Sequence, residues 1–182
     1  VIVFAFQTLY GYVYHQIGLL ITAFMVGLSL GGLLMIRRLA ASPFLPSAHT
    51  RDREGERSTL LKLELAIVLY WALLPITLSA LYSRITHPLV FTSIQGIFLF
   101  LNAVAGFLVG SQFPLANRMW LKGREDLRGT AGVLYACDLV GAFLGSVVVS
   151  VVLIPVLGIL ETCLLAATLK LGSLLLVAAL RP

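Results

Sequence analysis

Long apolar runs separated by short polar stretches form the dominant pattern along this chain. A helix needs about 20 mostly apolar residues to cross the roughly 30 Å hydrocarbon core of a bilayer. Five runs reach that length, at about 17–36, 60–83, 91–117, 131–154 and 159–180. Residues 1–14 would form a sixth, too short as it stands unless its start has been cut off. The pattern predicts an all-α polytopic membrane helix bundle of about six transmembrane helices, with residues 1–182 as a single integral membrane domain.

The composition agrees with this prediction. Of the 182 residues, 59% are hydrophobic and only 12% are charged, about half the roughly 25% that is usual in soluble domains. So few charged side chains cannot cover the surface of a soluble domain of this size. The opening run has no basic n-region and no small-residue cleavage site, so it is not a signal peptide. Because residue 1 is Val, we expect a fragment or a processed product.

The basic residues predict an orientation. If the spans alternate in direction, 11 of the 13 Lys and Arg residues fall on one side: in the 37–59 stretch and at Lys62, in the 118–130 stretch, and at Arg181. Loops rich in Lys and Arg stay in the cytoplasm. We therefore expect a multi-pass protein of the bacterial inner membrane, with solvated loops 37–59 and 118–130 and the C-terminus in the cytoplasm. The net charge of +5 is then explained without a nucleic-acid partner.

Glycines recur in pairs at a spacing of four residues, which is about one helical turn. The pairs are Gly27 with Gly31, Gly106 with Gly110, and Gly141 with Gly145. Each pair makes a flat strip on which another helix backbone can approach closely. We expect these strips to pack helices within the chain. Docking of a partner subunit and the lining of a substrate path remain alternatives.

One acidic residue, Asp138, lies inside the apolar run 131–154. An ionised Asp near the membrane centre costs about 2.5–3.5 kcal/mol on insertion scales, so it is expected to face protein or an aqueous cleft and to have a partner. Gly141 and Gly145 follow three and seven residues later on the same helix face. The sequence leaves three roles open: a structural carboxylate bonded to a neighbouring helix, a cation or proton site, and a contact to another domain or subunit.

The other polar residues of the spans suggest partners for this acid. Lys170 lies midway along the last span, too deep to reach the interface easily, and is a natural partner for an intramembrane acid. An ion pair between Asp138 and Lys170 is therefore a hypothesis. Glu161 falls where the last span begins, in the first helical turn, where negative charge is favoured. Glu64, beside Lys62, is expected at the membrane interface.

No catalytic motif is recognisable. The three histidines share no metal-ligand spacing, and the sequence has no HExxH, Walker or nucleotide-binding glycine motif. We therefore expect no metal and no cofactor, and no enzyme activity from this chain alone.

Three strings carry a resemblance to a known family. They are "FQTLYGYVYHQIGLLITAFMVGLSLGG" (6–32), "GSQFPLANR" (110–118) and "AGVLYACDLVGAFLGSVVVSVVLIPVLGI" (131–159). Together they resemble the transmembrane region of membrane-bound spermidine synthase-like bacterial proteins. The resemblance implies that Asp138 is a regular feature of such membrane domains. The aminopropyltransferase-type catalytic domain of that family is absent from these residues, so no catalytic residue is carried over.

The resemblance implies a membrane domain that anchors or assists an aminopropyltransferase-type activity and handles a polyamine-like cation, which Asp138 would attract. Its partners would be the lipid bilayer and a cytoplasmic enzyme domain or other membrane subunits. An alternative is a non-catalytic scaffold subunit of a respiratory or photosynthetic membrane complex, in which the glycine strips dock foreign helices. A third reading is a transporter, although a unit of six spans usually needs a second to build alternating access.

Overall fold

The computed structural model describes residues 1–182 except 11–13, 42–48, 83–87, 122–126 and 180–182. Every element in the described part is helical. The α-helices are α1 (Ile2–Tyr10), α2 (Tyr14–Ala41), α3 (His49–Tyr82), α4 (Pro88–Leu121), α5 (Leu127–Val147), α6 (Ile154–Leu157) and α7 (Ile159–Ala179), and the π-helix η1 (Val148–Leu153) joins α5 to α6.

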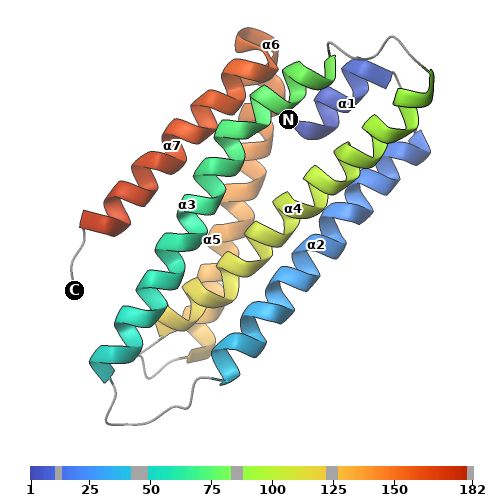
Figure 1. The fold of residues 1–182 in the computed structure, drawn as a ribbon. Coiled ribbons are helices and arrows are strands. Elements are labelled where there is room, and N and C mark those ends of the chain that lie inside the picture. Colours follow the sequence, from blue (N-terminus) through green and yellow to red (C-terminus); the bar gives the residue numbers. More distant parts are fainter. Residues whose placement is uncertain (11–13, 42–48, 83–87, 122–126, 180–182) are drawn as a thin grey trace.

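Five helical stretches are long and apolar enough to cross a membrane. They are His15–Ala41, Gly55–Leu81, Ser93–Met119, Gly132–Leu157 and Ile159–Ala179, and they alternate in direction along the bundle (Figure 1). The accessible surface is 11895 Å², whereas a soluble globular protein of 19.7 kDa would expose about 8,600 Å². Large apolar side chains such as Phe100 and Leu175 lie on the outer faces. The chain is therefore a polytopic membrane helix bundle.

The polar stretch 37–59, expected as a loop, is helical over most of its length. Helix α2 continues to Ala41 and α3 already begins at His49, while residues 42–48 lie outside the described part. The Glu and Arg residues of this stretch favour helix. Their side chains also bind neighbouring helices. Arg57 donates to the carbonyl oxygens of Val177 at 3.2 Å and Ala178 at 2.8 Å, which the end of α7 leaves without a helical partner.

We call the end of the bundle where α2 and α4 end and α3 begins the basic end. A second arginine joins these three helices there. Arg118 of α4 lies 2.8 Å from a carboxylate oxygen of Glu56 on α3. The same guanidinium donates to the carbonyl of Leu39, in the last turns of α2. A positive side chain is favourable at a helix C-terminus, where the backbone carbonyls carry partial negative charge. The basic residues of this end therefore hold helices together.

Helices α2 and α4 pack through two of the predicted glycine strips. A methyl group added at Gly27 would overlap the carbonyl oxygen of Ala103, and one added at Gly106 would overlap that of Phe24. Gly31 and Gly110 are equally close to the opposite backbone. Lipid does not drive helices together as water does, so close packing of this kind supplies the attraction. The structure places these four glycines in the contact between α2 and α4.

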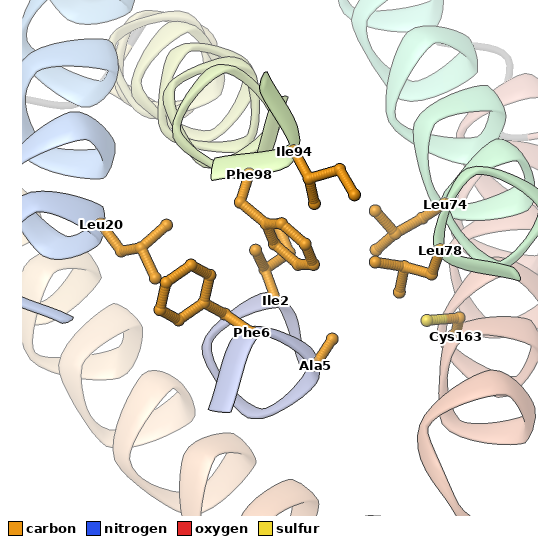
Figure 2. Packing of buried hydrophobic residues seen from close by; sticks show 9 residues of the cluster. All are labelled: Ile2, Ala5, Phe6, Leu20, Leu74, Leu78, Ile94, Phe98 and Cys163. Carbon is orange, nitrogen blue, oxygen red and sulfur yellow. The ribbon is translucent and has the colours of Figure 1, made fainter. Parts of the chain in front are cut away.

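The opposite end holds the hydrophobic core (Figure 2). Helix α1 inserts Phe6 against Phe98 of α4, with ring centroids 5.4 Å apart and ring planes at 79°. Buried Leu20, Leu74, Leu78 and Cys163 bring α2, α3 and α7 to the same cluster. This cluster joins the ends of α2, α3, α4 and α7 around α1.

Helix α5 changes form before it turns into α7. Pro155 has no N–H, and its ring would clash with the carbonyl four residues earlier in a regular helix. The preceding turn is widened into η1, in which the Ile154 N–H bonds to the carbonyl of Val149, five residues back. The chain then reverses at Gly158, whose φ of 93° suits glycine. Hence α7 runs in the opposite direction to α5, and it packs against α3.

Candidate intramembrane cation site

A cavity of about 1030 Å³ opens between α5 and the α2–α4 pair, with one wall from α3. Its lining is mostly apolar, with side chains such as Leu33, Leu60, Val109 and Phe113. Its volume is at the upper end of the roughly 300–1,000 Å³ that is typical of small-molecule sites. Its polar side chains include Ser29 on α2, Glu64 on α3, Gln112 on α4 and Asp138 on α5.

The cavity exists because α5 stands away from the rest of the bundle. No residue in the most apolar part of the α5 span is buried, whereas 28% of the residues are buried in the most apolar parts of α3 and α4. A side chain added at Gly141 or Gly145 would meet nothing within 4 Å. The third glycine strip thus makes none of the contact that the other two make, and its expected packing within the chain is not observed.

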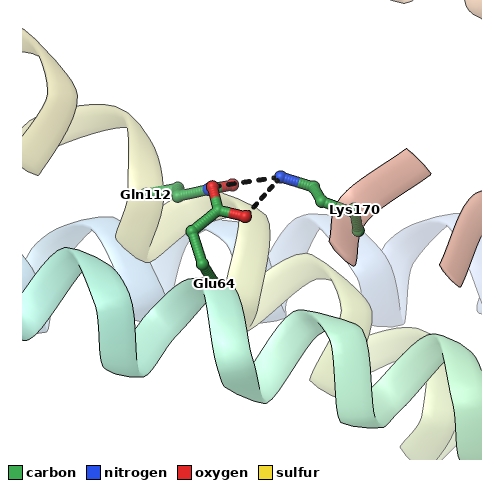
Figure 3. Close-up of polar contacts among 3 residues, drawn as sticks. All are labelled: Glu64, Gln112 and Lys170. Carbon is green, nitrogen blue, oxygen red and sulfur yellow. Dashed lines mark hydrogen bonds and ion pairs between the residues drawn. The ribbon is translucent and has the colours of Figure 1, made fainter. Parts of the chain in front are cut away.

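Glu64 is a buried carboxylate with partners on two other helices (Figure 3). Its exposed fraction is 4%, and Lys170 of α7 places Nζ 3.3 Å from each carboxylate oxygen. Gln112 of α4 donates its side-chain amide to Oε1. Three helices therefore meet at one carboxylate, and its charge is neutralised by the lysine.

Glu64, expected at the membrane interface, is buried between helices and bonded to α4 and α7. One expectation from the sequence is corrected. The acid that Lys170 pairs with is Glu64 and not Asp138. The reason is the antiparallel register of α3 and α7. Arg57 fixes the end of α7 at Val177, and seven residues along each helix from that contact bring Glu64 to Lys170.

Asp138 is placed differently. It lies six residues after Gly132, where the apolar span begins, roughly 9 Å along the helix at 1.5 Å per residue. Its side chain is exposed and lines the cavity. Within the part of the chain that the structure describes, no hydrogen bond or ion pair joins it to another residue. An unpaired carboxylate at this depth is costly in lipid, so the cavity is set up to attract a positive group.

An aromatic pair stands beside this carboxylate. Tyr135, one helical turn before Asp138, packs its ring edge-to-face against Phe113 of α4, with centroids 6.5 Å apart and planes at 75°. Both residues line the cavity. Aromatic faces attract organic cations. A carboxylate, two rings and apolar walls therefore form a surface suited to an organic ammonium ion.

The remaining candidates lie elsewhere. Glu161 is in the first turn of α7, as expected, but its side chain is exposed at the end of the bundle away from Glu64. It is not among the residues that line the cavity. Among the described residues, no group of three or more His, Cys, Asp and Glu side chains is placed to hold a metal ion. His49 and His87 have side chains outside the described part.

Comparisons with protein-family models, with curated proteins and with solved structures give no match for this chain.

Proposed function

We propose that this chain is a membrane domain that binds an organic ammonium ion inside the bilayer, with Asp138 as the anchoring carboxylate. The observation that carries the proposal is the contrast between two acids of one cavity. Glu64 already has Lys170 as its counter-ion, whereas Asp138 has no partner in the described part. A bound ammonium ion would offset the cost of keeping that carboxylate in a low-dielectric setting.

The domain would anchor or accompany an aminopropyltransferase-type activity. Support comes from the residues that resemble spermidine synthase-like membrane regions, above all the run 131–159, which contains Asp138. Polyamines and singly charged alkylamines both belong to the class of organic ammonium ions, which an unpaired carboxylate attracts. At the basic end, Arg57 and Arg118 bond to neighbouring helices. This end supplies a polar surface to which a soluble enzyme domain can bind.

Replacement of Asp138 tests the proposal. In Asp138→Asn the carboxylate is lost with little change of shape, so binding of a labelled amine to the protein in lipid nanodiscs should fall at least tenfold. Glu161→Gln is the matched control, because it removes an acid of the same protein outside the cavity and should leave binding unchanged. Helical content and elution volume verify that both variants fold. An unchanged binding isotherm in Asp138→Asn would contradict the proposal.

A scaffold role is the second candidate, and one observation favours it. Gly141 and Gly145 present the same small-residue spacing that joins α2 to α4, yet nothing lies within 4 Å of a side chain added there. A transmembrane helix of another subunit would fit such a strip. Purification in mild detergent separates the two functions: a stoichiometric complex with other membrane chains that is lost in Gly141→Leu supports the scaffold.

A further inference from the structure

We propose that the cavity selects an ammonium ion with a single positive charge and a hydrocarbon chain, and that Lys170 sets this limit by neutralising Glu64. This inference rests on the proposed function, in which Asp138 holds an ammonium ion. It adds the charge class of the ligand, which follows from the side chains that surround the cavity and which disfavours polyamines, because they carry two or more positive charges.

The charge count is the first step. Two carboxylates line the cavity, those of Glu64 and Asp138. The Lys170 ammonium lies 3.3 Å from both oxygens of Glu64, which also accepts a hydrogen bond from Gln112. That pair contributes no net charge. The described lining is therefore left with one negative charge, on Asp138, and one positive charge on a ligand balances it.

A second ammonium group on the ligand would find no free acid. To reach Glu64 it would have to displace Lys170, whose side chain is 31% exposed. The displaced ammonium would then remain inside the membrane region without a counter-ion, which is unfavourable in a low-dielectric setting. Lys170 thus occupies the second anionic position as a tethered alkylammonium ion, and a multiply charged ligand gains less from the cavity than its charge suggests.

The walls supply the second requirement. Leu28, Leu33 and Val109 give the cavity an apolar lining, which suits a hydrocarbon chain and offers nothing to further charges. Near the carboxylate, the rings of Phe113 and Tyr135 stand edge-to-face and can surround an ammonium head group. An amphipathic monocation fits this cavity, because its ammonium group can bind near Asp138 and the two rings while its hydrocarbon chain contacts the apolar walls.

Two ligands of equal chain length test the inference. Dodecyltrimethylammonium carries one fixed charge, and its analogue with a trimethylammonium group at each end carries two. Binding is measured in phosphatidylcholine nanodiscs, with empty nanodiscs subtracted. We expect the wild-type chain to bind the monocation at least tenfold more tightly than the dication. In Lys170→Met, which frees the Glu64 carboxylate to accept a second ammonium group, the preference should shift toward the dication by a factor of ten or more.

The variant Glu64→Gln/Lys170→Met is the matched control, because it removes the ion pair and keeps a single negative charge. It should retain the wild-type preference for the monocation, and it decides the question if Lys170→Met alone does not fold. Tighter wild-type binding of the dication, lost in Asp138→Asn, would overturn the charge limit and leave the proposed function standing. Binding of both ligands that is unaffected by Asp138→Asn would overturn the proposed function itself.

Discussion

Replacement of one glycine between α2 and α4 gives the sharpest prediction about stability. Gly106 faces the backbone of α2, where a methyl group would overlap the carbonyl oxygen of Phe24 and crowd the amide of Leu28. Gly96 lies ten residues earlier on the same helix, is exposed, and has nothing within 4 Å of an added methyl. The two positions therefore offer a matched pair, Gly106→Ala and Gly96→Ala, within α4.

The magnitude follows from two opposing terms. Alanine is favoured over glycine inside a helix by about 1 kcal/mol, and this gain applies at both sites. At Gly106 the backbones must separate to admit the methyl group, and overpacking of this kind costs typically 1–3 kcal/mol. The difference in free energy of unfolding between the two variants removes the shared helix term. It should be about 1–3 kcal/mol, with Gly106→Ala the less stable.

Reversible unfolding by denaturing detergent, followed by far-ultraviolet circular dichroism and by gel mobility, measures this difference. Gly106→Leu should be still less stable, because the larger side chain forces α2 and α4 further apart. Equal stabilities for the two alanine variants would refute the reasoning, since they would mean that α2 and α4 do not touch through this strip.

Three further predictions concern the Glu64–Lys170 ion pair, the glycine strip at Gly141 and Gly145, and the basic end. A double-mutant cycle of Glu64→Gln and Lys170→Met should give a coupling energy of about 1–2 kcal/mol, the upper range for polar pairs in membranes; a value of zero would contradict the contact. Gly141→Leu should leave the unfolding free energy of the isolated chain unchanged within about 0.5 kcal/mol, because nothing packs there; a loss like that of the α4 glycine would show that α5 is packed. Arg57→Gln should lower stability by about 1 kcal/mol through loss of its bonds to the end of α7, and Lys62→Gln is the control for charge; equal effects would refute a specific contact.

The number and direction of the long helices could be predicted from the sequence, because the length of an apolar run is set by bilayer thickness. The stretch 37–59 was misjudged for a physical reason. Its Arg and Glu residues mark solvent exposure but also favour helix, and Arg57 finds bonding partners on α7 that no local pattern reveals.

The candidate site could be predicted only in part. Asp138 stands out because a carboxylate within an apolar run is rare. Glu64 was not predicted as a site residue, because it lies near the start of its apolar run and no local pattern shows which helices pack against it. Its pairing with Lys170 depends on α3 and α7 being neighbours, although α4 and α5 lie between them in the chain. The signal that could have found it is the pair of opposite charges inside two apolar runs.

The same limit applies to the glycine strips. The spacing of four residues predicts a close-packing face, and for Gly27 and Gly106 that is what the helices use. The arrangement of the whole bundle decides which two strips pack against each other. It also leaves the strip at Gly141 without a neighbouring helix.

The carboxyl carbon signal of Asp138, followed by solid-state nuclear magnetic resonance in nanodiscs, tests the central claim most directly. Titration with an amphipathic ammonium ion should shift this signal in a saturable manner, with a cross-peak from the ammonium methyl groups to the Asp138 carboxyl carbon. The chemical shift of the Glu64 carboxyl carbon should not change, because Lys170 is already the counter-ion of that carboxylate. A saturable shift at Glu64 with none at Asp138 would contradict the account.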